Sequence, residues 1–320
     1  MQKKIAILTS GGDAPGMNAA IRAVVRTAIY HELEVVGVRR GYAGLINGDY
    51  QQMNLGSVAD IIQRGGTILQ TSRSKEFETE KGRRKALEKL RQIGVTGLVA
   101  IGGEGTFRGA WELAEMGLSV IGVPGTIDND VLGTELSIGF DTVINTVVES
   151  INKIRDTATS HERVFVIEVM GRNSGKIALA AGLAGGAESI LLPELPLDLP
   201  GVVANLKRGL ARGKRHSIII VAEGVGDCNE ITRRIQEESG LETRLSILGY
   251  IQRGGTPTAQ DRILASRMGA KAVELLLAGQ SGMMTATQKG KIVPVSLQEA
   301  FVPGNDLNMD DYELAGILAI

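Results

Sequence analysis

The amino-acid sequence predicts an α/β protein with a three-layer architecture and mostly parallel sheets. Three observations support this fold class. The 320 residues include 42 glycines but only 3% aromatic residues. Short apolar runs rich in Val and Ile end at glycines, and amphipathic helical patterns lie between the runs. Alternating strands and helices form right-handed βαβ units, which place helices on both faces of a parallel sheet.

The expected strands are apolar along their whole length, which is typical of parallel sheets covered on both faces. Most are followed by glycines, where the backbone needs a positive φ or a close approach by another group. The runs are residues 5–8 before Gly11 and Gly12, 98–101 before Gly102 and Gly103, 119–123, 164–169 before Gly171, and 218–221 before Gly224 and Gly226.

Three helices are expected from apolar residues at helical spacing. They cover residues 18–29, 83–93 and 142–155. A domain boundary is expected near Gly139, between an acidic turn and the third helix. The chain is long enough for one large or two moderate domains.

Composition restricts the partners and the location of the protein. With 35 basic and 36 acidic residues the formal charge is −1, so no overall field attracts nucleic acid or an anionic membrane. Cys228 is the single cysteine, which excludes an intrachain disulfide and suits the reducing cytoplasm. The first apolar run is too short for a signal peptide, and no stretch has the length of a membrane span. We therefore expect a cytoplasmic protein that binds neither nucleic acid nor a membrane.

Two glycine-rich turns have the form of anion-binding sites. TSGGDAPGMNAAIR (residues 9–22) runs from a strand through a glycine turn into a helix, and IGGEGTFRGA (residues 101–110) repeats this pattern. Such turns present backbone N–H groups and a helix N-terminus to a phosphate. Glu104, among the glycines of the second turn, is a candidate ligand for a hard cation. For one turn alone, a tight strand-to-helix connection is an equally good explanation.

A third turn, PGTIDND (residues 124–130), places two aspartates around an asparagine after an apolar strand. Like charges repel, so this arrangement is costly unless a cation, or a proton to be removed, meets it. Asp and Asn are also common turn formers that bind their own backbone. In an open parallel sheet the carboxyl ends of strands form the binding edge, and this context favours a catalytic turn.

Together these motifs resemble bacterial-type ATP-dependent 6-phosphofructokinases over nearly the whole chain. The resemblance extends to RDTATSHER (155–163), VMGRNSG (169–175), AEG (222–224) and LGYIQRGG (248–255). It implies transfer of the γ-phosphoryl of ATP to the 1-hydroxyl of fructose 6-phosphate, giving fructose 1,6-bisphosphate and ADP in glycolysis. It also implies two Rossmann-like α/β/α domains with the active site in the cleft between them. The expected ATP-binding domain is 1–139 plus 253–303, and the expected sugar-phosphate domain is 140–252 plus 304–320.

The resemblance implies specific roles for individual residues. Asp128 would take the proton from the sugar hydroxyl, beside Asp130, while Thr126 holds the acceptor and Arg172 stabilises the transition state. The ATP contacts would be Gly12, Arg73, Ser74, Gly102, Gly103, Gly105 and Thr106, with Mg²⁺ at Glu104. The sugar-phosphate contacts would be Thr126, Asp128, Arg163, Met170, Gly171, Arg172, Glu223, Arg244, Tyr250 and Arg253. Arg163 and Arg244 match arginines that act across subunits of a homotetramer.

A separate basic group matches the effector site at which the family binds ADP or phosphoenolpyruvate between subunits. Its members are Arg22, Arg26, Asp60, Arg155, Gly186, Glu188, Arg212, Lys214, Arg215 and His216. Arg22 and Arg26 lie one helical turn apart on one face. A solubilising basic face is the alternative for residues 212–216, and Leu55 stands where the family has another effector arginine.

Several positions bear on the choice of substrate and on activity. Pyrophosphate-dependent relatives carry Asp and Lys where this chain has Gly105 and Gly125, so ATP is the expected donor. Glu104 replaces the usual magnesium aspartate, Tyr250 the usual phosphate-contacting histidine, and Lys75 a usual proline. These departures leave two alternatives open, a weakly active or non-catalytic sensor of sugar phosphate or nucleotide, and a kinase for another phosphorylated sugar.

Overall fold

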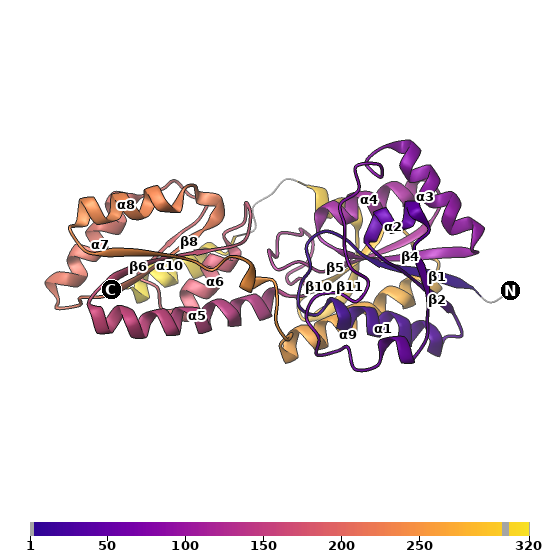
Figure 1. Cartoon of the computed structure of the whole chain (residues 1–320), viewed down its shortest axis with the longest axis horizontal. Helices are drawn as coiled ribbons and strands as arrows, with labels where there is room; N and C mark the ends of the chain where they lie inside the picture. Colours follow the sequence, from indigo (N-terminus) through magenta and orange to yellow (C-terminus); the bar gives the residue numbers. More distant parts are fainter. Residues whose placement is uncertain (1–2, 303–306, 320) are drawn as a thin grey trace. The chain divides into compact units, whose positions relative to one another are not determined.

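The computed structural model describes residues 3–302 and 307–319. The chain divides into two compact units, each built around its own sheet (Figure 1). The first unit comprises Met1–Thr142 with Arg253–Gly304, and the second comprises Val143–Gln252 with Asn305–Ile320. The assignment of ATP to the first unit and sugar phosphate to the second stays a prediction.

In the first unit, the described residues form a seven-stranded sheet. Its strands, in spatial order, are β11 (Lys291–Ser296), β10 (Met283–Gln288), β5 (Ser119–Pro124), β4 (Val95–Gly102), β1 (Lys4–Thr9), β2 (Glu34–Val38) and β3 (Tyr50–Met53). The five strands from β10 to β2 pair in parallel, while β3 and β11 pair antiparallel at the two edges. The carboxyl ends of β1, β4 and β5 therefore lie at the same edge of the sheet.

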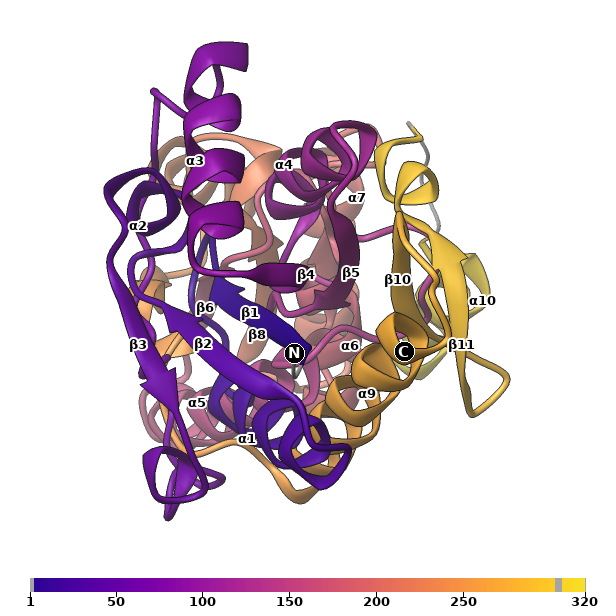
Figure 2. The same cartoon turned by 90° about the vertical axis from the view of Figure 1, so that its right-hand side faces the viewer.

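Helices cover both faces of this sheet (Figure 2). One face carries α1 (Met17–Tyr30) and α9 (Ala259–Leu277), and the other carries α2 (Gly41–Asn47), α3 (Glu80–Gln92) and α4 (Glu104–Glu115). The core beneath the second group contains the fully buried side chains of Leu45, Leu90 and Phe107. Because β1, β4 and β5 are buried on both faces, their sequences are apolar throughout rather than alternating.

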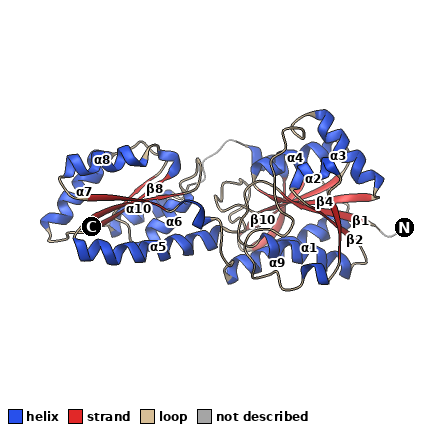
Figure 3. Ribbon diagram, in the orientation of Figure 1, coloured by secondary structure: helices blue, strands red, loops and turns tan. Residues whose placement is uncertain are grey.

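The second unit contains a four-stranded sheet of parallel strands within the described residues. Its order is β7 (Ser189–Leu191), β8 (Ser217–Ala222), β6 (Val164–Val169) and β9 (Thr243–Ile247). Helices α7 (Leu199–Ala211) and α8 (Cys228–Ser239) cover one face, and α5 (Phe140–His161), α6 (Lys176–Gly185) and α10 (Met309–Leu318) cover the other (Figure 3). Both units thus have three layers.

The expected fold class is confirmed, since both sheets are mostly parallel and lie between helices. The three helices expected from the sequence lie within or close to α1, α3 and α5, whose bounds differ from the expected ones by a few residues. Short strands at the sheet edges, such as β3 and β9, carry no clear apolar run, and the sequence alone did not reveal them. None of the helices in the described part of the chain has the length and apolarity needed to cross a membrane.

A buried carboxylate in the first unit holds the start of α5. Asp261, on α9, is 1% exposed, and it accepts hydrogen bonds from the backbone N–H of Gly139 at 2.9 Å, the N–H of Thr142 at 2.8 Å and the Thr142 hydroxyl at 2.5 Å. Burial raises the pKa of Asp261, and the hydrogen bonds from Thr142 and Gly139 oppose this shift. The carboxylate thereby satisfies N–H groups that a helix N-terminus cannot satisfy internally.

We predict that Asp261→Ala lowers the free energy of unfolding by about 3 kcal/mol, because buried backbone donors lose their acceptor. Urea denaturation followed by circular dichroism measures this loss. The matched control is Thr79→Ala, which removes an exposed cap of α3 in the same unit and should cost about 1 kcal/mol. Equal losses in the two variants would contradict the role of Asp261 as a buried acceptor that stabilises the start of α5.

Candidate functional site

The turns that follow β1 and β4 are tied to each other. The N–H of Ser10 donates to the Ile101 carbonyl at 3.0 Å, and the Thr106 hydroxyl donates to the Ser10 carbonyl at 3.0 Å. A Cβ at Gly102 would lie 2.5 Å from the Ser10 carbonyl oxygen. Glycine at this position therefore allows the two turns to approach as closely as they do.

Helix α4 begins inside the second glycine turn. Gly103 is its N-cap residue, no side chain caps this end, and Glu104 is the first helical residue. The backbone N–H groups at a helix N-terminus carry partial positive charge and favour an anion. A Cβ at Gly105 would have no atom within 4 Å. The position of a side chain at Gly105 is thus open space.

The carboxylate of Glu104, the predicted metal ligand, forms an ion pair with Arg108. The Arg108 Nε and Nη2 atoms lie 2.7 and 2.5 Å from Glu104 Oε1. Both side chains are about half exposed, at 43% and 57%. An exposed pair at this helical spacing is worth only about 0.3–0.5 kcal/mol, so a divalent cation can displace the arginine. Within the described residues there is no cluster of three or more His, Cys, Asp or Glu side chains that could hold a metal without other ligands.

The loop of residues 71–77 lies beside both glycine turns. At one end the Thr71 hydroxyl donates to the Gly11 carbonyl at 2.7 Å. At the other end the Phe77 ring stacks on Tyr42, with ring centroids 4.0 Å apart, and the Tyr42 hydroxyl donates to the Thr106 carbonyl at 2.5 Å. The loop carries the predicted ATP contacts Arg73, which is exposed, and Ser74, which is half-buried.

The acidic turn after β5 adjoins the glycine turn after β4. A Cβ at Gly103 would lie 3.6 Å from the Thr126 Cβ. The N–H of Asp128 donates to the Thr126 hydroxyl at 3.2 Å. Asp128 is 4% exposed, whereas Asp130 is half-buried. The predicted base and acceptor-binding threonine are therefore close to the predicted phosphate-binding turn.

Arg253 joins this group from a distant part of the sequence. A Cβ at Gly12 would collide with the Arg253 guanidinium group, so the arginine lies directly against the first glycine turn. The Arg253 Nε is buried without a hydrogen-bond partner. An arginine in this position can neutralise an anion bound at the turn.

In the second unit, a single carboxylate organises the turn after β6. Glu223 Oε1 accepts hydrogen bonds from the backbone N–H of Gly171 at 3.1 Å and of Arg172 at 2.7 Å. Arg172 has a φ of 54° and Gly171 a φ of 138°. The N–H of Met170 donates to Gln252, whose side chain is fully buried. Four predicted sugar-phosphate contacts therefore lie together in this turn.

Two further predicted arginines share one acidic partner at the start of β9. The Arg163 Nε lies 2.9 Å from the Glu242 carboxylate, and Arg244 pairs with the same group. The hydrogen bonds from Arg163 and then Arg244 lower the pKa of Glu242. One carboxylate between two guanidinium groups leaves a net positive charge at this surface. Tyr250 is 82% exposed and lies in the 3₁₀ helix Gly249–Gln252.

Some of the predicted effector residues of the second unit lie close to Glu188. The Glu188 carboxylate pairs with Lys214 and accepts the N–H of Ile218 at 2.5 Å, while Arg155 donates to the carbonyls of residues 185 and 186. Gly186 has a φ of 63°. Arg212, Arg215 and His216 come directly before β8, with Arg215 paired to Glu162. In the first unit, Arg22 and Arg26 lie on α1 and Asp60 follows the 3₁₀ helix Gly56–Val58, which contacts α1.

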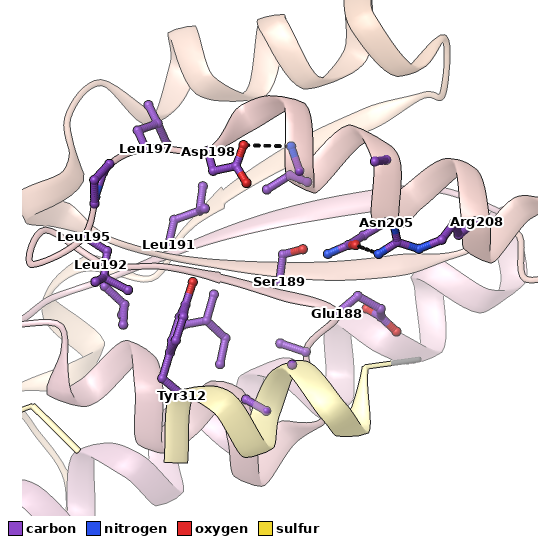
Figure 4. Close-up of a pocket in the computed structure, with 18 residues that line it drawn as sticks. Glu188, Ser189, Leu191, Leu192, Leu195, Leu197, Asp198, Asn205, Arg208 and Tyr312 are labelled. Atoms are coloured by element: carbon purple, nitrogen blue, oxygen red, sulfur yellow. Dashed lines mark hydrogen bonds between the residues drawn. The ribbon is translucent and has the colours of Figure 1, made fainter. Parts of the chain in front are cut away.

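A cavity of about 290 Å³ lies in the second unit between β7, α7 and α10 (Figure 4). Glu188, Asn205 and Tyr312 are among its lining residues. The hydroxyl of Ser189, which also lines it, is buried without a hydrogen-bond partner. No predicted catalytic residue lines this cavity, and it shares Glu188 with the predicted effector residues.

The structure therefore brings the predicted residues together in distinct groups. In the first unit, Gly12, Arg73, Ser74, Gly102, Gly103, Glu104, Gly105, Thr106, Thr126, Asp128, Asp130 and Arg253 lie on adjoining turns at one sheet edge. In the second unit, Met170, Gly171, Arg172 and Glu223 form one group, and Arg163 and Arg244 form another. The first group combines anion-binding backbone with a buried carboxylate, as a phosphoryl-transfer site requires.

Sequence reasoning missed the residues that support these groups. Gln252 and Glu242 are polar residues adjacent to recognised positions, but nothing in the sequence says that they bind Met170 and Arg163. Ser137 and Thr287, which contact the acidic turn and the segment that follows it, lie outside every motif. Only the position of Gln252 within LGYIQRGG offered a signal.

Comparison with known proteins agrees with this geometry. The family model described as phosphofructokinase matches residues 4–276. The chain is 60% identical to the ATP-dependent 6-phosphofructokinase of Halothermothrix orenii and 58% identical to that of Bacillus subtilis, in each case over 99% of this chain and 100% of the relative. The solved phosphofructokinase of Saccharomyces cerevisiae superimposes with a TM-score of 0.87 at 38% identity, covering 93% of this chain and 45% of the yeast chain.

Because the family model covers most of the chain and the bacterial relatives match it from end to end, the resemblance suggested by the motifs is established. The chain belongs to the phosphofructokinase family.

Proposed function

We propose that this protein is an ATP-dependent 6-phosphofructokinase of glycolysis in which Asp128 is the catalytic base. The observation that carries the activity is the identity of 58–60%, over complete chains, with bacterial enzymes of that name. The roles of individual residues rest on the contacts described above. The proposed contacts to ATP and to fructose 6-phosphate are described below unit by unit.

The triphosphate of ATP would bind at the two glycine turns of the first unit. The N-terminus of α4, the backbone near Gly12 and the guanidinium groups of Arg73 and Arg253 supply positive potential there. Arg253, for which the resemblance implied a sugar-phosphate contact, lies against Gly12. We propose that it acts near the transferring phosphoryl group, where both substrates meet.

Mg²⁺ would enter with the nucleotide and be held by Glu104, phosphate oxygens and water. Magnesium in kinase sites needs only one or two carboxylates besides substrate phosphates, and the single carboxylate of Glu104 at the start of α4 fits this requirement. The ion would neutralise charge on the transferring phosphoryl group.

The acceptor would be the 1-hydroxyl of fructose 6-phosphate, positioned by Thr126. As this oxygen bonds to the γ-phosphorus, the bond from phosphorus to the ADP oxygen breaks, and the hydroxyl proton passes to Asp128. The backbone of Arg172 is fixed by Glu223, which supports a role for its guanidinium group in stabilising the transferring phosphoryl.

The 6-phosphate and the sugar would bind in the second unit through Arg163, Arg244 and Tyr250, with Met170, Gly171 and Glu223 near the hydroxyl groups. The shared pair with Glu242 keeps two arginines together at an exposed surface. We propose that these arginines serve a neighbouring subunit in a homotetramer. Tyr250 can donate a hydrogen bond but adds no positive charge.

Regulation by ADP or phosphoenolpyruvate is proposed at the basic residues near Glu188. These residues include Arg155, Lys214 and neighbouring cations in one unit, and Arg22 and Arg26 are candidates from another subunit. The balanced charge and the single buried cysteine support a cytoplasmic location. A non-catalytic sensor is disfavoured, because Asp128, Thr126 and the glycine turns are present and adjoin one another.

We predict that Asp128→Asn lowers kcat about 10²- to 10⁴-fold, because the amide cannot accept the hydroxyl proton. The KM for fructose 6-phosphate should change little. Coupled assays of fructose 1,6-bisphosphate formation measure both constants, with tagatose 6-phosphate and sedoheptulose 7-phosphate as competing acceptors. A variant that keeps more than a tenth of the wild-type kcat would contradict the role of Asp128. Faster turnover of another sugar phosphate by the wild type would contradict the assignment of fructose 6-phosphate as the acceptor.

We predict that Gly105→Asp raises the KM for ATP about tenfold, because a carboxylate would repel the phosphates at a cost of about 1.4 kcal/mol. The side chain enters open space, so the fold should be preserved. Gly105→Ala is the matched control, and its KM should stay close to that of the wild type. An equal rise in both variants would indicate a loss of backbone freedom instead of electrostatic repulsion.

We predict opposite effects of two substitutions on the Mg²⁺ requirement at fixed ATP. Glu104→Gln should raise the Mg²⁺ concentration for half-maximal rate, because the metal loses its carboxylate. Arg108→Ala should lower this Mg²⁺ concentration about twofold. The ion pair with Glu104 is worth about 0.4 kcal/mol, and Mg²⁺ no longer has to break it. No change in either variant would argue against a metal at Glu104.

A further inference from the structure

The acidic turn depends on a residue with an unusual backbone conformation. Asn129, between the two aspartates, has a φ of 50° and is 5% exposed. Asparagine adopts this left-handed conformation more readily than most residues with a side chain. The left-handed conformation of Asn129 sets the direction in which the chain leaves Asp128.

The side chain of Asn129 bridges the turn to the segment of residues 134–138, which leads back to the sheet. Its Oδ1 accepts the N–H of Ser137 at 2.7 Å, and its Nδ2 donates to the Glu135 carbonyl at 3.1 Å. Ser137, which is 1% exposed, donates its hydroxyl to the Thr126 carbonyl at 2.7 Å. Asn129 and Ser137, named here the cross-brace, thus connect the residues on both sides of Asp128 to the returning segment.

The returning segment is itself fixed to the sheet. Thr287 on β10 accepts the N–H of Leu136 at 2.8 Å and donates its own N–H to the Thr134 hydroxyl at 2.9 Å. At the end of the segment, the N–H of Ile138 donates to the Pro124 carbonyl at 3.0 Å. The cross-brace therefore joins the acidic turn to a part of the chain that is held by two strands.

We propose that Asn129 and Ser137 are positioning residues, which act through Thr126 and Asp128 to hold the base and the acceptor hydroxyl in reacting geometry. This inference rests on the proposed role of Asp128. Neither residue needs to touch substrate. We expect their contribution in kcat, because the proposed contacts to the 6-phosphate are other residues, in the second unit.

The decisive variant is Asn129→Gly. Glycine adopts a φ of 50° without steric cost. The variant therefore removes the side-chain hydrogen bonds, while the backbone can keep its conformation in the turn. A misplacement of about 1 Å can cost 10²-fold in rate. We expect kcat to fall about 10- to 100-fold while the KM for fructose 6-phosphate changes less than threefold.

Ser137→Ala tests the other half of the cross-brace without altering the left-handed residue. It removes the hydroxyl bonds to the Thr126 carbonyl and to Asn129 Oδ1, and we expect kcat to fall about 3- to 10-fold. If the two residues act as one unit, the double variant should lose little more than Asn129→Gly alone. Fully multiplicative losses would overturn the cross-brace.

Thr285→Val is the matched control. Thr285 is fully buried on β10, the strand that carries Thr287, but its hydroxyl bonds to Gly122 at 3.4 Å and not to the returning segment. This variant should keep the wild-type kcat within twofold. A comparable fall in the control would mean that any polar loss on β10 lowers the rate, which would overturn the assignment.

Asp128→Asn distinguishes failure of this inference from failure of the proposed function. If Asp128→Asn loses kcat while Asn129→Gly and Ser137→Ala are folded and fully active, the cross-brace is overturned and the base stands. If Asp128→Asn keeps its kcat, the base itself is overturned. A rise in the KM for fructose 6-phosphate with unchanged kcat in the Asn129 and Ser137 variants would also overturn the inference.

Discussion

The common edge at which β1, β4 and β5 end is the constraint on which the rest of the structure depends. Parallel pairing places the last residues of these strands side by side, and backbone bonds continue the pairing into the turns. Ser10 donates to Ile101, and Gly125 donates to Gly102, both at 3.0 Å. Three turns far apart in sequence therefore adjoin one another before any ligand is present. Glycine at 102 is essential, because a Cβ there would overlap the neighbouring turn.

Positive and negative groups lie on neighbouring turns at this edge. The N-terminus of α4 and the arginines beside the glycine turns favour a phosphate chain. Asp128 lies on the neighbouring turn, almost completely buried. A carboxylate next to an anion-binding site is unfavourable in isolation, but it is what a proton acceptor in phosphoryl transfer requires. Stability and activity make opposing demands on this turn, and the hydrogen bonds of Asn129, Ser137 and Thr287 offset the cost.

Glu104 and Tyr250, two positions at which the chain departs from the family pattern, are both at least partly exposed. Glu104 is longer than aspartate by one methylene, and it is paired with Arg108 on the solvent side of α4. Because that pair is exposed, it competes only weakly with a metal. Tyr250 is also exposed, and it belongs to the same short helix as the buried Gln252. The substituted positions thus lie at the periphery, whereas the core of each turn retains its glycines and carboxylates.

The sequence by itself determined the fold class, the strands that are apolar throughout, and the turns that contain glycines and aspartates. These features are local, because burial on both faces and a positive φ each restrict the residues allowed at single positions. The short edge strands, the capping of α5 by Asp261, and the support of the acidic turn by Ser137 and Thr287 were decided only by tertiary structure. In the last two cases one polar side chain meets a backbone group more than a hundred residues away, or in a different turn, and no local pattern encodes that meeting. Serine, threonine and aspartate can bind many partners, so the folded chain determines which partner each one finds.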